Sequence, residues 1–215
     1  MDGEGTSHCA YAAMGRFLMH IVGIDLRKKA GKSIMSHKKI QALAEGAILV
    51  AAATALSYAK LMELPQGGSV CIGMLPIFLF CARWGWKESF LTAFAYGLLQ
   101  LIFDGAYAWG PTSMLMDYVL AYGVLGVACF FRRQKGGVFT GTVVGCVCRF
   151  VVHFISGVTI YRIYEPTLLF NTTFTNPWIY SAVYNGSYVM IDMVLCLVIT
   201  ALLYKPLKKY FAPQD

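Results

Sequence analysis

Six ionisable side chains lie within or at the ends of the apolar stretches of this sequence, where a charge is costly and therefore suggests chemistry. They are Glu45, Asp104, Asp117, Arg149, His153 and Asp192. In a membrane each would cost about 2.5 kcal/mol or more, so such groups usually mark a binding site or a transport path. Carboxylates with an imidazole and a guanidinium can bind a polar ligand, transfer protons or form ion pairs between helices.

Spacing adds to what these residue types indicate. Arg149 and His153 are four residues apart, which places them on one face of a helix. Asp117 is followed directly by Tyr118. A carboxylate beside aromatic rings suits a flat, cationic, nitrogen-rich ligand, because the rings stack on it and the acid accepts its N–H groups. The alternative is an Asp117–Arg149 ion pair that only holds two helices together.

Aromatic residues gather in and near the connections between the apolar stretches. This set contains Tyr107, Trp109, Tyr161, Tyr164, Trp178, Tyr180 and Tyr184. The polar Asn185 follows Tyr180 by five residues. Aromatic belts at the membrane surface are the alternative explanation for any single member of the set. Together with the ionisable groups, these residues predict a site that opens to the outside.

The sequence gives little support to a metal-binding site or a nucleotide-binding site. The seven cysteines include no C-x-x-C pair, and their spacing fits none of the usual zinc sites. We therefore expect reduced, buried thiols and no metal or cofactor. Gly31-Lys32-Ser33 resembles the end of a phosphate-binding P-loop, but the required first glycine is Leu26.

The composition shows what kind of fold must position these groups. Of 215 residues, 58% are hydrophobic and 13% are charged, against about 45–50% and about 25% in typical soluble domains. The mean hydropathy is +0.59. A single soluble core cannot hide so much apolar surface, and disordered chains lack it. The sequence predicts a multi-spanning membrane protein.

Apolar stretches long enough to cross a bilayer, about 20 residues each, cover residues 40–60, 112–131, 138–161 and 178–204. Two shorter stretches cover 70–83 and 88–104, and the first of these must be a short helix or be extended by the 61–69 loop. The continuous apolar pattern favours helices over a β-barrel. We expect an all-α protein with six transmembrane helices.

The charges predict the orientation of these helices. With both termini in the cytoplasm, all but three of the 18 lysines and arginines fall on cytoplasmic segments, as the positive-inside rule requires. The net charge of +7 therefore reports topology and not a nucleic-acid partner. Residues 1–34 are expected to be a poorly ordered extension, with Met35 as a possible natural start, and 35–215 the transmembrane domain.

Four groups of motifs occur in order along the membrane portion. They are Leu64-Pro65-Gln66-Gly67-Gly68-Ser69, then Met116-Asp117-Tyr118 with Leu120-Ala121-Tyr122-Gly123, then Arg149-x-x-x-His153-x-x-Ser156-Gly157-Val158, and finally Tyr180-Ser181-x-x-Tyr184-Asn185. Together they make residues 38–210 resemble the thiamine-specific substrate-binding component, or S-component, of energy-coupling factor (ECF) transporters. The resemblance implies a six-helix bundle that binds thiamine near its outer face with high affinity.

The resemblance also implies which residues bind the vitamin. The family's ligand-contacting positions map to Asp117, Tyr118, His153, Gly157, Tyr180 and Asn185. Two departures stand out. Tyr161 replaces a tryptophan that the family often has eight residues after the histidine, and 61–69 lacks the family's loop tryptophan. We expect Tyr161, Tyr164, Trp109 or Trp178 to supply the missing stacking.

Partners follow from the same resemblance. Ala47, Ala51, Ala55 and Ala59 form a stripe of small residues on the first helix, which lets another helix approach closely. In the family such a stripe docks the transmembrane coupling subunit, and two ATPase subunits supply the energy. Packing against helices of the same chain is the alternative.

Two other functions stay open from the sequence. One is a lone proton-coupled vitamin carrier. The other is an intramembrane enzyme that uses Asp104, Asp117 and His153 as acid–base or metal groups. The resemblance favours a thiamine-binding subunit that is not an enzyme.

Depth in the membrane separates the roles of Arg149 and His153. At 1.5 Å per residue, His153 lies about 6 Å further outward, nearer the expected level of Asp117. We therefore expect Arg149 to pair with another acid or with backbone carbonyls, and His153 to face the ligand. A neutral imidazole suits a cationic ligand, so binding should weaken as His153 protonates, around its ordinary pKa of about 6.5.

Overall fold

The structure is a computed structural model that describes residues 37–64, 67–104, 110–164, 168–169 and 172–214, with side chains described outside 160–173. The chain divides into two compact units, residues 1–40 and 41–215. Of the first, the structure describes His37–Ile40, the first turn of a helix, and the account below concerns the second. The predicted extension, 1–34, lies outside the described residues.

Six helices form the described part of the chain and confirm the predicted all-α class. They are α3 (His37–Tyr58), α4 (Leu75–Arg83), α5 (Trp86–Asp104), a fourth made of α6 (Pro111–Ser113), η2 (Met114–Leu120), α7 (Ala121–Gly123) and η3 (Val124–Phe131), then α8 (Gly137–Tyr164) and α9 (Pro177–Tyr204). Two antiparallel hairpins accompany them, β1 (Met62–Glu63) with β2 (Ser69–Val70), and β3 (Leu168–Leu169) with β4 (Thr172–Thr173).

Four of the described helices are long and apolar enough to cross a membrane. They cover His37–Tyr58, Pro111–Phe131, Gly137–Thr159 and Pro177–Tyr204, close to the four long stretches expected from hydropathy. The expected stretch 88–104 corresponds to α5, and 70–83 contains α4, a short helix of nine residues. The orientation of the helices relative to the membrane stays a prediction.

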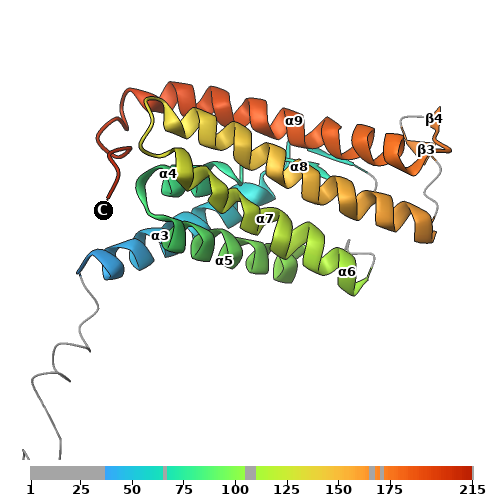
Figure 1. The fold of residues 1–215 in the computed structure, drawn as a ribbon, viewed down its shortest axis with the longest axis horizontal. Coiled ribbons are helices and arrows are strands. Elements are labelled where there is room, and N and C mark those ends of the chain that lie inside the picture. The colour runs from blue at the N-terminus through green and yellow to red at the C-terminus, as the bar shows by residue number, and fades with distance from the viewer. Residues whose placement is uncertain (1–36, 65–66, 105–109, 165–167, 170–171, 215) are drawn as a thin grey trace, which may run out of the picture. The chain divides into compact units, whose positions relative to one another are not determined.

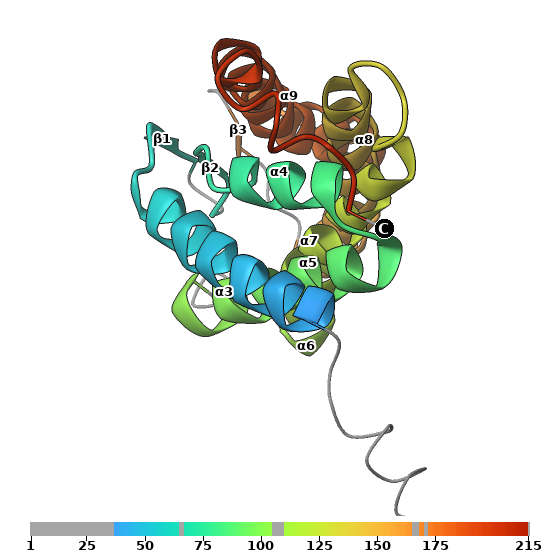
Figure 2. The same ribbon diagram turned by 90° about the vertical axis from the view of Figure 1, so that its left-hand side faces the viewer.

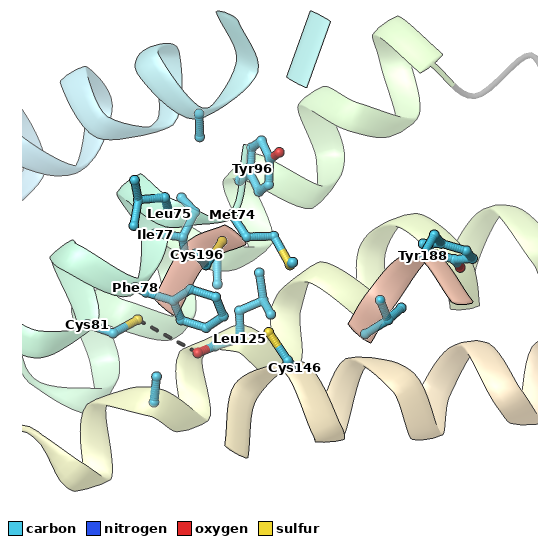
Figure 3. Packing of buried hydrophobic residues seen from close by; sticks show 14 of the residues in the cluster. Met74, Leu75, Ile77, Phe78, Cys81, Tyr96, Leu125, Cys146, Tyr188 and Cys196 are labelled. Carbon is cyan, nitrogen blue, oxygen red and sulfur yellow. Dashed lines mark hydrogen bonds between the residues drawn. The ribbon is translucent and has the colours of Figure 1, made fainter. Parts of the chain in front are cut away.

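The short helix α4 lies inside the bundle, against α5, η3 and α8, while α8 and α9 run side by side (Figures 1 and 2). Its residues from Leu75 to Ala82 are apolar and nearly all buried, as expected for a helix that is hydrophobic all round. Figure 3 shows Met74, Phe78 and Cys81 packed with Leu125 of η3 and Cys146 of α8. This core fixes the positions of α8 and the fourth helix.

The fourth helix departs from regular α-helical winding. The sequence predicts a helical span over 112–131, which the structure confirms, but Met114–Leu120 is a π-helix and Val124–Phe131 a 3₁₀-helix. Gly126 lies against Phe90 of α5, where an added Cβ would be 2.9 Å from the ring. Hydropathy does not report such contacts, so the winding could not be predicted from it.

After α9 the chain turns back to the C-terminal end of α4. The Gln214 N–H donates to the Arg83 carbonyl (2.8 Å), and Arg132 Nη1 donates to the Gln214 carbonyl (3.2 Å). Arg83 Nη1 donates to the Tyr210 carbonyl (3.2 Å), and Arg83 Nε lies 3.0 Å from Glu45 Oε2.

The Tyr210 phenol has a pKa raised to about 12, mainly because it is buried and to a lesser extent because the Glu45 carboxylate lies nearby. Glu45 of α3 thus pairs with Arg83 of α4, which also bonds to the C-terminal segment.

Candidate functional site

The Asp117 carboxylate is the centre of a polar cluster between the fourth helix and α8. Its Oδ1 lies 3.0 Å from His153 Nδ1, and its Oδ2 accepts hydrogen bonds from Ser113 Oγ (2.7 Å) and Ser156 Oγ (2.8 Å). The side chain is 20% exposed. Three hydrogen bonds leave about one of four acceptor positions on the carboxylate for a ligand.

The π-helix η2 presents this carboxylate. Single π-turns are rare and occur often at functional sites. Asp117 in η2 accepts from Ser113, four residues earlier in α6, and also contacts His153 and Ser156 of α8. Local winding and an interhelical hydrogen-bond cluster therefore coincide at the acid that the sequence singled out.

His153 lies between a cation and an anion, and this fixes its tautomer. Arg149 Nε lies 3.3 Å from His153 Nε2. A guanidinium can only donate, so Nε2 must accept and the proton of the neutral ring must be on Nδ1. That N–H then donates to Asp117 Oδ1. The buried imidazole is neutral in this arrangement, as the sequence analysis expects for a cation-binding site.

Arg149 pairs with Asp192 of α9. Its Nη1 lies 3.3 Å from Asp192 Oδ2, and its Nη2 donates to Tyr122 Oη at 3.2 Å. The guanidinium carbon also lies 4.6 Å from the centre of the Tyr122 ring, a cation–π contact. The prediction that Arg149 pairs with an acid other than Asp117 is confirmed. Within the described residues, His153 separates Arg149 from Asp117, in place of the direct ion pair weighed above.

Three tyrosines spaced four apart line one face of α9 next to this cluster. Tyr180 and Tyr184 are parallel, with ring centres 6.0 Å apart, and Tyr188 meets the His153 ring edge-on at 5.8 Å. The Gly68 N–H donates to Tyr184 Oη (2.8 Å). The three rings form a series of aromatic contacts that begins at His153. The sequence analysis named Tyr180 and Tyr184 among its candidate aromatic residues, but not Tyr188.

Asn185 lies on the same helix and is fully engaged in the fold. Its Nδ2 donates to the carbonyls of His153 and Ser181, each at 3.1 Å, and its Oδ1 accepts from Tyr188 Oη (2.9 Å). The Oδ1 atom retains a second lone pair. Asn185 therefore ties α8 to α9 directly behind His153.

Other predicted residues lie elsewhere or are not described. The Tyr118 hydroxyl donates to the Asp104 carbonyl (2.7 Å), so it points to the end of α5, while the Asp104 carboxylate pairs with Lys60 (3.2 Å). Trp178 is half exposed and packs on Phe154. Tyr107 and Trp109, and the side chains of Tyr161 and Tyr164, for which the sequence made predictions, lie outside the described residues.

Four members of the cluster were not assigned to the ligand site from the sequence, although Asp192 was among the six ionisable residues noted there. Ser156 follows His153 by three residues and Ser113 precedes Asp117 by four, so helical spacing could have indicated both. Tyr122 and Asp192 reach Arg149 from two other helices. No spacing within one helix predicts such contacts.

A metal centre has no support in the part of the chain that the structure describes. No three His, Cys, Asp or Glu side chains there come close enough to hold a metal ion. The described cysteines are free thiols, buried except for the partly buried Cys148. Asp117 and His153 are instead satisfied by serine hydroxyls and each other.

Comparison with known proteins gives the context for this site. The family model described as Thiamine transporter protein (Thia_YuaJ) matches residues 43–212. The chain belongs to this family. It is 32% identical to thiamine transporter ThiT of Bacillus subtilis, over 78% of this chain and 92% of that protein. It is 26% identical to thiamine transporter ThiT of Lacticaseibacillus paracasei, over 85% of this chain and 96% of that protein.

A solved structure has the same fold. The structure of ThiT from Listeria monocytogenes matches with a TM-score of 0.72 at 22% identity, covering 83% of this chain and all of that chain. The resemblance drawn from the motifs is thus confirmed at the level of family and fold. The chain is a multi-pass membrane protein of a transporter family, and the enzyme alternative loses its support.

Gly157 lies where α8 and α9 approach most closely in this cluster. A Cβ there would collide with Ser181 Oγ and lie 2.8 Å from Asn185 Nδ2. We expect Gly157→Ala to lower the free energy of unfolding by about 1–3 kcal/mol, typical of overpacking, and to weaken ligand binding by moving Asn185. Thermal unfolding in detergent with and without ligand measures both.

Gly186→Ala is the matched control, because the nearest atom to its added Cβ is Phe150 at 3.7 Å, an ordinary contact. Equal stability of the two variants would contradict the close approach at Gly157.

Proposed function

We propose that this chain binds thiamine and is the substrate-binding component of an ECF transporter that takes up the vitamin. Membership of the thiamine transporter family supports the proposal. The observation that carries it is the contact between Asp117 and His153, 3.0 Å, beside the α9 tyrosines. It joins residues from distant parts of the chain into a site whose chemistry suits thiamine.

Thiamine has two parts that this site can recognise. Its aminopyrimidine ring donates N–H groups, which a carboxylate accepts, and its thiazolium ring carries a permanent positive charge. Asp117 retains one acceptor position and a negative charge, and the contacting rings of Tyr180, Tyr184 and Tyr188 extend along α9 from its partner His153. Tyr118, Gly157, Tyr161 and Asn185 belong to the proposed site through the resemblance.

A binding measurement tests this function directly. Purified protein should bind thiamine with a Kd of about nanomolar, equivalent to about −12 kcal/mol, and should bind riboflavin and biotin far more weakly. Intrinsic tryptophan fluorescence can follow the titration. Chemically unchanged thiamine after long incubation would exclude an enzyme, and absence of thiamine binding would refute the proposal.

The docking of a coupling subunit is proposed from the surface of α3. This helix has two stripes of small residues. The inner one, Ala42, Gly46, Val50 and Ala53, is buried. The outer one, Ala47, Ala51 and Ala55, is exposed. Packing within the chain uses the inner stripe, so the outer stripe remains available to a helix of another subunit.

Energy for uptake is proposed to come from that subunit and two ATPases. The sequence contains no intact P-loop. Uptake of labelled thiamine by cells that lack the coupling and ATPase subunits distinguishes this proposal from a lone proton-coupled carrier. We expect no uptake in such cells, whereas a lone carrier would continue to work.

The hydrogen bonds of His153 predict that binding depends on pH. Protonation would put an N–H on Nε2 facing the Arg149 N–H and add a positive charge beside a cationic ligand. Affinity should therefore fall as pH falls. Thiamine affinity should therefore be constant between neutral pH and pH 8 and decrease toward pH 5, once the imidazole takes up a proton.

The control is His153→Gln, which binds more weakly but cannot titrate. Both proteins are titrated with thiamine from pH 5 to 8. Any protonation of thiamine itself affects both titrations equally and cancels in the comparison. An unchanged pH dependence in the variant would show that His153 is not the titrating group.

A further inference from the structure

A buried ion pair joins α8 to α9 directly behind the proposed site. Arg149 and Asp192 are 6% and 0% exposed, with Nη1 and Oδ2 3.3 Å apart. The other oxygen, Oδ1, accepts the Cys71 N–H at 2.9 Å. The proposed contacts with thiamine do not involve Asp192, yet its carboxylate is the most deeply buried acid described in the site region.

The contacts of Arg149 show what this carboxylate does. Nη1 is directed to Asp192 and Met74 Sδ (2.9 Å), and Nη2 to Tyr122, so the NH₂ groups are held away from Asp117. Only Nε is directed toward the site, and it reaches His153. With Arg149 neutralised by Asp192 and His153 neutral, Asp117 remains the uncompensated charge of the described cluster.

We propose that Asp192 is a specificity-determining positioning residue, which holds and neutralises Arg149 so that the site keeps the negative charge that selects a cationic ligand. The inference rests on the proposed thiamine function. Without the charge of Asp192, the positive charge of Arg149 would have no compensating acid beside it, and only His153 would separate it from Asp117. The site would then carry no net negative charge, and preference for a cation over its neutral analogue would fall.

Asp192→Asn is the test variant, because the amide oxygen can still accept the Cys71 N–H while the charge is lost. For an assumed separation of about 8 Å and an effective dielectric constant of about 20, one unit charge changes the affinity for a cation by roughly 30-fold. We expect thiamine binding to weaken by about that factor. Binding of an uncharged analogue, with thiophene in place of thiazolium, should change by less than about threefold.

Two further variants separate charge from structure. Glu45→Gln is the matched control, since it also converts an arginine-paired acid to an amide, but at the Arg83 end of α4. The double variant Arg149→Met with Asp192→Asn removes both charges, and replacing a buried ion pair by neutral groups is often tolerated. We expect it to recover at least about tenfold in thiamine affinity relative to Asp192→Asn.

Each outcome decides the proposal. Equal losses for thiamine and its neutral analogue, or no recovery in the double variant, would show that Asp192 is only structural and overturn it. If Asp192→Asn does not fold, recovery of selective thiamine binding by the double variant supports the proposal, and misfolding of both overturns it. Unchanged thiamine affinity in Asp192→Asn would overturn the role of Asp192 but not the proposed function. Absence of thiamine binding by the wild-type protein would refute the proposed function itself.

Discussion

Replacing Asp117 with asparagine is expected to weaken thiamine binding by roughly 10- to 100-fold. A hydrogen bond to a charged group contributes about 1.5–3 kcal/mol, and the variant also loses the charge that faces the cation. The amide nitrogen cannot accept from Ser113 or Ser156, but their hydroxyls can rotate and accept from it instead. The fold should therefore survive, and fluorescence titration reports the loss of affinity alone.

Asp104→Asn is the control for this experiment. Asp104 is an acid at the C-terminal end of α5, whose carboxylate pairs with Lys60 and whose backbone carbonyl accepts from Tyr118. We expect a change in affinity of less than about threefold. Equal, small effects of the two substitutions would refute the assignment of Asp117 to the ligand.

Replacing Ala51 with tryptophan is expected to lower thiamine uptake by cells at least about tenfold while leaving binding unchanged within about twofold. The residue is exposed on the outer stripe of α3, and a large side chain there would hold a docking helix several Å away. The Asp117 cluster lies on other helices, so purified protein should bind thiamine normally. Uptake and binding measured on the same variant separate coupling from recognition.

Ala201→Trp on α9 is the matched control, because Ala201 is also exposed and lies outside the stripe. It should transport normally. Loss of uptake in both variants would indicate a general effect of a large side chain in the membrane, and normal uptake by Ala51→Trp would contradict docking at the stripe.

Helical spacing and depth predicted much of this site, and tertiary contacts account for the rest. The shared face of Arg149 and His153, and their 6 Å offset, predicted that the histidine would lie near the level of Asp117 and that the arginine would pair elsewhere, and the structure has Asp117 in contact with His153 and Arg149 paired with Asp192. These quantities depend only on the rise and period of one helix. The partner of Arg149 depends on how α9 packs against α8, which no single-helix pattern contains.

Tyr118 and Gly157 show the same limit. The motif places Tyr118 next to Asp117, but successive residues point in different directions on a helix, and its hydroxyl contacts the end of α5. Gly157 lies against the side chains of Ser181 and Asn185 of α9, where its small size is what matters. A motif shows which residues occur together, whereas their separate roles require the packed helices.

The return of the C-terminal segment to α4 matters for anyone who labels this protein. Because the backbone at Tyr210 and Gln214 bonds to Arg83 and Arg132, an affinity tag or fluorophore attached at Gln214 would begin beside two arginines. An acidic tag there would compete with the carbonyls for these side chains. A Gly/Ser linker of about 10 residues, with an average reach of about 17 Å, would separate the label from this contact.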